Sequence, residues 1–318
     1  MKKEILFFLI GSIKKNERVA LVVVVDANGH SPGKPGFCMA VSDTELVGTI
    51  GGGTIEIGMV TASRRKLLKN NTDPEISYRV HNTSGGADES GMICGGDQTT
   101  AIVPIRLSDL GALEYLANSV DGRGALKILC LSQAGITVSD NTDEVPHSFI
   151  WRENGNWEYR ETIGQKYKAF IFGGGHVSLA LSPILSSLGF RIIILDERPL
   201  INTIQQNKYI SDLIISPFEE LPKKIEEGSN SYAFIMTPGH RYDESVLREL
   251  LGKNLKYLGM IGSKKKVAEI FARLKNDGFE ENSLARVRSP IGIPIGSKTA
   301  EEIAISIAAQ VIQVKNNQ

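Results

Sequence analysis

The segment from Lys168 onward constrains the fold more than any other part of the 318-residue chain. It joins an apolar strand, a turn with three consecutive glycines, a helix to about residue 188 and a second apolar strand that ends at Asp196. A strand–turn–helix–strand unit of this kind is typical of a parallel sheet covered by helices. The sequence therefore predicts an α/β fold whose C-terminal half is a Rossmann-like parallel-sheet domain.

The glycine turn predicts a site for a phosphate group. Gly173 and Gly175 stand where a tight turn and a phosphate leave no room for a side chain, and the helix from His176 offers free amides. Asp196 follows at roughly the 20-residue spacing expected of a ligand for ribose hydroxyls. Arg198 could engage a phosphate instead, which leaves the nucleotide open. The alternative is a purely structural turn.

A second loop is expected at the same edge of the sheet. Residues 232–236 predict a buried strand that leads into Thr237, His240 and Asp243. Because ligands of open α/β sheets bind at the carboxyl ends of the strands, these three residues are candidates for the crevice beside the glycine turn. The alternative is that His240 caps a loop and Asp243 is the N-cap of the next helix.

A third candidate anion site follows the strand predicted at residues 257–261. Gly262 and Ser263 open a helix whose first residues are three lysines, so backbone amides and cations would lie together. The lysines could equally form a solvated face of that helix.

Glycine-rich segments recur in the N-terminal half. The valine run at residues 19–25 predicts a strand buried on both faces, and a loop rich in glycine and proline follows it. A helix is expected from about residue 54 to 70, with Glu56 one turn in. The glycines Gly51, Gly52 and Gly53 open this helix. They predict another amide-rich pocket.

Cys94 is the candidate metal ligand. It is the one cysteine flanked by glycines, and the amides of Gly95 and Gly96 would stabilise its thiolate. Cys38 and Cys130 are expected to be small buried apolar side chains. Three dispersed cysteines do not make a disulfide scaffold, and their odd number favours the reducing cytoplasm. A zinc site is not expected, because the five histidines show no two-ligand spacing.

The length predicts two domains, because single cores stop growing at roughly 250–300 residues. We expect an N-terminal α/β domain over residues 1–108, a bridging segment over 109–165 and the Rossmann-like domain over 166–318. The 36 basic residues balance the 36 acidic ones, so no overall field favours nucleic acid or an acidic membrane. We also expect no membrane-spanning segment, because no apolar run approaches about 20 residues.

The order of these motifs resembles that of the XdhC/CoxI family over nearly the whole chain. The N-terminal likeness lies in Ser31-Pro-Gly-Lys-Pro-Gly36, Gly48-Thr-Ile-Gly-Gly-Gly53 with Glu56, and Gly91-Met-Ile-Cys-Gly-Gly96. The C-terminal likeness lies in Ile171-Phe-Gly-Gly-Gly-His-Val177, Leu195-Asp-Glu-Arg-Pro199, Met236-Thr with His240 and Asp243, Leu258-Gly-Met-Ile-Gly-Ser263, and Pro290-Ile-Gly292 with Glu301-Glu-Ile-Ala304. The resemblance implies a chaperone that binds molybdenum cofactor (molybdopterin) rather than a catalyst.

The resemblance also implies partners. Family members protect the cofactor while a cysteine desulfurase installs its terminal sulfur, and they deliver it to xanthine dehydrogenase or a related molybdenum hydroxylase. A homodimer is expected as well. Two departures bear on this: the family's usual Thr-His-Asp-His is here Thr237-Pro-Gly-His240, and residues 81–88 differ from the usual acidic segment. The first puts in doubt any role that needs two histidines, and the second could signal a different client.

Two other functions fit the same residues. An NAD(P)-dependent oxidoreductase would use the Rossmann-like half directly and would need a proton donor such as His240. A regulatory nucleotide sensor would bind NAD(P) or another nucleotide without chemistry.

Overall fold

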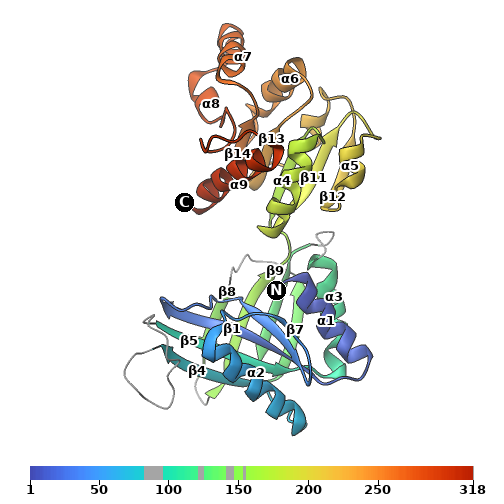
Figure 1. The fold of residues 1–318 in the computed structure, drawn as a ribbon, viewed down its shortest axis with the longest axis vertical. Helices are drawn as coiled ribbons and strands as arrows, with labels where there is room; N and C mark the ends of the chain where they lie inside the picture. The colour runs from blue at the N-terminus through green and yellow to red at the C-terminus, as the bar shows by residue number, and fades with distance from the viewer. Residues whose placement is uncertain (82–95, 121–124, 141–146, 153–154, 318) are drawn as a thin grey trace. The chain divides into compact units, whose positions relative to one another are not determined.

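The structure is a computed structural model that describes residues 1–81, 96–120, 125–140, 147–152 and 155–317. It divides into two compact units, Met1–Gly164 and Gln165–Gln318 (Figure 1). The first unit carries two antiparallel sheets and the second a parallel sheet between helices. The predicted α/β class is confirmed.

The first sheet of the N-terminal unit is antiparallel and has the order β3-β2-β1-β5-β4. Its strands are β1 (Val19–Gly29), β2 (Cys38–Ser42), β3 (Leu46–Gly48), β4 (Glu75–His81) and β5 (Gly96–Pro104). As predicted, the valine run in β1 is buried on both faces: alternate residues pack toward α1 (Lys3–Lys14) and toward α2 (Gly53–Leu68). The two faces of one strand therefore belong to two separate apolar clusters.

A second antiparallel sheet completes the N-terminal unit in the order β7-β6-β9-β8. Its elements are β6 (Lys127–Ser132), β7 (Gly135–Asp140), β8 (His147–Trp151) and β9 (Trp157–Ile163), preceded by α3 (Leu110–Val120). Buried side chains of α3, β6 and β9 join those of α1 and β1 in one core. A bridging segment was expected over residues 109–165, and the described residues of 109–164 contribute to the core of the first unit.

The C-terminal unit contains one parallel sheet of order β12-β11-β10-β13-β14. The strands are β10 (Tyr167–Phe172), β11 (Phe190–Asp196), β12 (Ile210–Ile215), β13 (Gly228–Ile235) and β14 (Leu255–Met260). The helices are α4 (His176–Ser187), α5 (Asn202–Gln206), α6 (His240–Leu250), α7 (Lys264–Asn276), α8 (Glu281–Ala285) and α9 (Ala300–Asn316). Side chains of α4 and α9 pack on one face of the sheet, and those of α6 and α7 on the other.

The strand order reverses direction between β10 and β13, which is the switch point where open α/β sheets bind ligands. The glycine turn follows β10, and the Thr237 loop follows β13. Both predicted loops therefore flank the same point.

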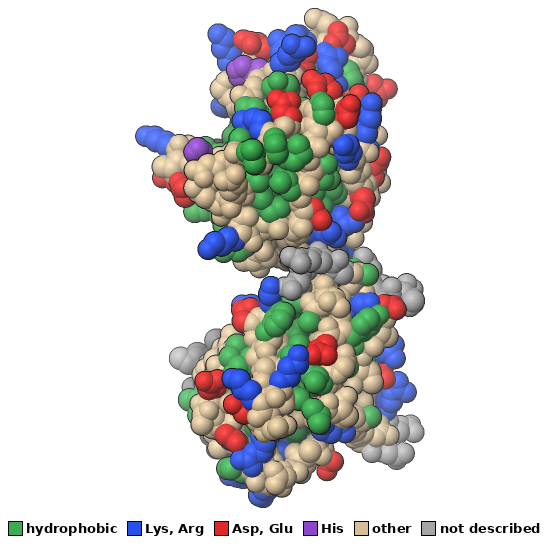
Figure 2. All heavy atoms as spheres, turned by 90° about the vertical axis from the view of Figure 1, so that its right-hand side faces the viewer, with side chains coloured by type: hydrophobic (Ala, Val, Ile, Leu, Met, Phe, Trp, Pro, Cys, Tyr) green, Lys and Arg blue, Asp and Glu red, His purple; other side chains and the backbone are tan. Residues whose placement is uncertain are grey.

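The strand β12 forms an exposed edge of this sheet. The crossover to it contains only the five-residue α5, and Leu213 and Ile215 are left exposed. Figure 2 shows apolar side chains gathered on one face of this unit, among charges of both signs. None of the helices in the described ranges is long and apolar enough to cross a membrane.

Candidate functional site

The three glycines of the turn after β10 have three different environments. Gly173 has φ +104°, and a Cβ there would lie 2.3 Å from the carbonyl oxygen of Met236 on the neighbouring strand. A Cβ at Gly174 would meet Ile204 of α5 at 2.4 Å. At Gly175, which has φ −77°, a Cβ would find no heavy atom of the described residues within 4 Å. Only Gly175 borders open space.

Gly175 is also the N-cap of α4, and no described side chain caps that helix. The first amides of a helix have no intrahelical partner and carry a partial positive charge. His176, the first helical residue, is exposed. Open space and the first amides of α4 therefore coincide at Gly175, and the anion site stays a prediction.

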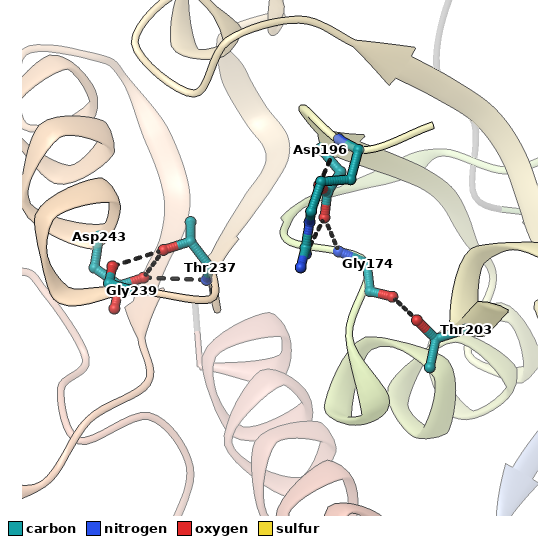
Figure 3. A network of polar contacts seen from close by, with 7 residues as sticks. Gly174, Asp196, Thr203, Thr237, Gly239 and Asp243 are labelled. Atoms are coloured by element: carbon teal, nitrogen blue, oxygen red, sulfur yellow. Dashed lines mark hydrogen bonds and ion pairs between the residues drawn. The ribbon is translucent and has the colours of Figure 1, made fainter. Parts of the chain in front are cut away.

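Asp196, at the end of β11, lies against this turn with its carboxylate fully engaged (Figure 3). Its Oδ2 accepts from the Gly174 amide at 2.8 Å and from Arg198 Nη2 at 2.8 Å. Its Oδ1 accepts from the amide and Nε of Arg198, both at 2.9 Å. Burial would raise the pKa of Asp196, but the hydrogen bonds from Arg198 and Gly174 outweigh it and hold the pKa below its usual value.

A second buried carboxylate, Asp243, lies on the other side of the switch point (Figure 3). The N-cap of α6 is Gly239, so the alternative that Asp243 caps this helix is wrong. Asp243 instead reaches back to the end of β13, where it accepts from the hydroxyl of Thr237 at 2.6 Å and from its amide at 3.1 Å. Its second oxygen pairs with Lys266. His240, the first residue of α6, is exposed.

The third predicted anion site is already occupied by the protein's own groups. Ser263 caps α7 by accepting from the amide of Lys266 at 3.2 Å, next to Gly262. Lys266 Nζ donates to Asp243 and to the carbonyl of Ile261. Lys264 and Lys265 are exposed, so two of the three lysines lie on a solvated face of the helix, as the alternative predicted.

In the N-terminal unit, Glu56 organises the glycine loop. One oxygen of Glu56 accepts from the Thr49 hydroxyl at 2.6 Å, from the Ile50 amide at 2.9 Å and from the Gly52 amide at 3.1 Å. The glycines Gly51, Gly52 and Gly53 all have positive φ. Two backbone amides of the loop and the Thr49 hydroxyl are thus used internally by a carboxylate.

Three motifs that are distant in sequence meet at this loop. A Cβ on Gly51 would lie 2.6 Å from the Gly33 amide, and one on Gly33 would lie 2.3 Å from the side chain of Gln98. Gly96 opens β5 and pairs with Gly29 of β1. Gln98, which sequence reasoning missed, is buried and accepts from Ser31 at 3.0 Å. Its polar type gave no signal, because only tertiary packing buries it.

The structure describes two of the three cysteines, Cys38 and Cys130. Cys94 and Gly95 lie outside the described residues, so the candidate metal ligand stays a prediction. Cys38 is buried as expected, and burial raises the pKa of its thiol. Cys130 is only half-buried, because the neighbouring Leu129 and Leu131 face the core instead. Within the described ranges, no three His, Cys, Asp or Glu side chains cluster as a metal site.

The described residues fit the phosphate end of molybdenum cofactor. The space at Gly175 and the uncapped N-terminus of α4 suit a terminal phosphate, and Arg198 adds a cation beside them. When bound, the cofactor would supply a dithiolene-held molybdenum centre. The fit of a metal ligand rests on Cys94.

The chain is similar to two curated proteins. The chain is 24% identical over 305 residues to YqeB of Escherichia coli (strain K12), described as uncharacterised, and covers 45% of it. It is 25% identical over 155 residues, 49% of the chain, to a protein of Bacillus subtilis (strain 168) described as a probable xanthine dehydrogenase component, again covering 45%. The chain thus spans about half the length of these curated relatives.

A crystal structure described as a xanthine dehydrogenase from Bacillus halodurans has the same fold. The TM-score is 0.74 at 22% identity, over 99% of this chain and 96% of that one. Two family models also match: that of the XdhC and CoxI family over residues 12–78, and that of the XdhC Rossmann domain over residues 169–311. The chain belongs to the XdhC/CoxI family.

Proposed function

We propose that this protein binds molybdenum cofactor and supplies it to xanthine dehydrogenase or a related molybdenum hydroxylase. The observation that carries the proposal is the anion site at the switch point of the second unit. Among the residues that the structure describes, no side chain caps the N-terminus of α4 and none fills the space at Gly175, while Arg198 lies next to the turn. A phosphate-bearing cofactor requires donors of this kind.

The family and the relatives' names favour xanthine dehydrogenase as the client. They include the probable xanthine dehydrogenase component of Bacillus subtilis and a structure described as a xanthine dehydrogenase. We further propose that the cofactor is held while a cysteine desulfurase installs its terminal sulfur, with two copies of the chain forming a dimer. Cys94 is the soft ligand that we assign to the metal, because thiolates suit soft ions.

The strand order of the second unit is also compatible with a bound nucleotide. One observation argues against the usual binding mode, in which an acidic residue binds the ribose. A dinucleotide's ribose would need a free carboxylate at the end of β11. Asp196 is completely buried there, and both of its oxygens already accept hydrogen bonds. An NAD(P)-dependent oxidoreductase is therefore the weaker candidate.

Cofactor retention tests the proposal. The full chain is purified from a molybdenum-competent host, and molybdenum and released pterin are measured per protein. Gly175→Val should lose retention by tenfold or more, because its side chain fills the open space at the phosphate site. Gly252→Val is the matched control, because Gly252 is exposed and a Cβ there also meets no described atom within 4 Å. Equal retention by Gly175→Val and wild type, or no retention by wild type, would refute the proposal.

A further inference from the structure

We propose that Arg198 recognises the phosphate of the ligand bound by the C-terminal unit, and that Asp196 positions Arg198 instead of binding a ribose. This inference rests on the proposed function and names the side chain that selects the ligand. It differs from the usual dinucleotide arrangement, in which the acidic residue at this position contacts the ligand directly.

The first step is that Asp196 has no capacity left for a ligand. Four donors surround its two oxygens at 2.8–2.9 Å, three of them from Arg198 and one from Gly174. The residue is 0% exposed. A ribose diol could reach the carboxylate only if Arg198 left and the turn opened. The buried carboxylate would then have lost its cation, which is costly.

The second step is that Arg198 faces two ways. Its Nε and Nη2 bind Asp196, whereas Nη1 has no hydrogen-bond partner among the described residues. The side chain is 39% exposed. A guanidinium presents five N–H donors in a planar fork and binds phosphate in two-pronged geometry. The bonds to Asp196 fix this fork in one orientation, with its remaining donors directed away from the carboxylate.

The third step is the position of Arg198 relative to the glycine turn. Arg198 Nη2 and the Gly174 amide bind the same oxygen of Asp196, so they lie at most two hydrogen-bond lengths apart. Gly175 and the uncapped N-terminus of α4 follow directly in the chain. The hydroxyl of Thr203 donates to the carbonyl of Gly174 and holds the turn from its other side. The guanidinium is therefore fixed beside the Gly174 amide, two residues before the first residue of α4.

The fourth step is the chemistry that this arrangement accepts. Arg198 and the first backbone amides of α4 contribute hydrogen-bond donors at this point. Ribose hydroxyls need an acceptor for at least one proton, whereas a phosphate monoester is an acceptor at all of its outer oxygens. The ligand class is thus a phosphate monoester, from a pterin or from a nucleotide 2′-phosphate.

A ligand–protein cycle tests the assignment on the full chain. The probe is the fluorescent oxidised pterin obtained from molybdenum cofactor, with its phosphate intact or removed by alkaline phosphatase. Wild type should bind the phosphorylated form about 10- to 100-fold more tightly, as for a hydrogen bond to a charged group. Arg198→Gln should lose most of this preference, and the first amides of α4 should account for the part that remains. Asp196→Asn should lose most of the preference with little change for the dephosphorylated form.

The control is a second arginine–aspartate pair, which joins β11 to β12. Arg191, near the other end of β11, binds Asp212 through Nη2 at 2.7 Å and Nε at 2.8 Å. Arg191→Gln should keep the full preference for phosphate. If Arg198→Gln does not fold, Arg198→Lys retains a cation and should show a reduced preference. An unchanged preference in the folded Arg198 variant, or equal binding of both pterins by wild type, would overturn the assignment.

Failure of the assignment can be told from failure of the proposed function. Wild type that retains molybdenum cofactor while Arg198→Gln keeps the phosphate preference refutes the role of Arg198 alone. Wild type that retains no cofactor and binds neither pterin refutes both. If wild type binds no pterin but prefers NADP⁺ over NAD⁺, and Arg198→Gln loses that preference, Arg198 is the phosphate ligand and a nucleotide replaces the cofactor.

Discussion

Exchanging Gly173 or Gly175 for alanine separates the structural glycine of the turn from the ligand-binding one. At Gly173 the backbone has φ +104°, and the new Cβ would lie 2.3 Å from the Met236 carbonyl oxygen. Backbone strain of about 1–3 kcal/mol and steric overlap of about 1–3 kcal/mol both apply. We expect Gly173→Ala to lower the free energy of unfolding of the C-terminal unit by about 3 kcal/mol. Gly175→Ala has neither penalty and should stay within about 0.5 kcal/mol of wild type.

Urea unfolding can assign the effect to one unit. Both tryptophans, Trp151 and Trp157, belong to the N-terminal unit, so tryptophan fluorescence follows that unit. Circular dichroism includes the helices of both units. With a slope of about 2 kcal/mol per molar urea, the expected loss moves the transition of the C-terminal unit down by about 1.5 M. The tryptophan transition of Gly173→Ala should match that of wild type.

Two outcomes would refute this reasoning. If Gly173→Ala unfolds at the wild-type urea concentration, the close approach to Met236 does not constrain the turn. If Gly175→Ala is destabilised as much as Gly173→Ala, other atoms occupy the space beside Gly175. In the second case a loss of cofactor in a Gly175 variant would no longer report on the ligand.

The remaining predictions concern Asp196 and the thiols. The pKa of Asp196 is lowered by Arg198, so its contribution to stability is present above the unfolded value of about 3.9 and is lost as pH falls below it. Urea midpoints between about pH 5 and pH 2 should therefore fall less steeply in Asp196→Asn than in wild type, and parallel curves would contradict this. Thiol labelling should be fastest at Cys94 and slow at Cys38 and Cys130, whose pKa values burial raises; equal rates at all three would contradict this.

The elements that the sequence predicted well are those whose pattern is local. The valine run at residues 19–25 and the strand–turn–helix–strand unit from Lys168 carry their signal in consecutive residues, and both formed as expected. The role of the segment 109–165 was less predictable, because its buried side chains share a core with α1 and β1, which lie far away in the sequence. The strand β12 was missed because it is an edge strand with no fully buried residue, so its sequence carries no clear buried stripe.

The residues of the site were easier to find than their roles. The pattern placed Asp196, Thr237 and Asp243 at the carboxyl edge of the sheet. Asp196 ends β11, and Asp243 in α6 reaches back to Thr237, just after β13. The partners of the two carboxylates were harder to predict. Lys266 reaches Asp243 from a helix 23 positions later, and a run of three lysines does not reveal which one turns inward. Pairs formed by tertiary packing have no local signal.

Stability alone does not account for the two charged pairs at the switch point. Asp196 and Asp243 are both completely buried, and each pairs with a cation. Taking such charges out of water is expensive, and apolar residues of similar volume often stabilise a fold as well or better. Each carboxylate also holds a backbone amide at a strand end, Gly174 in one case and Thr237 in the other. Buried carboxylates that fix cations and loops at a ligand-binding edge are best explained by the geometry they impose on the ligand's surroundings.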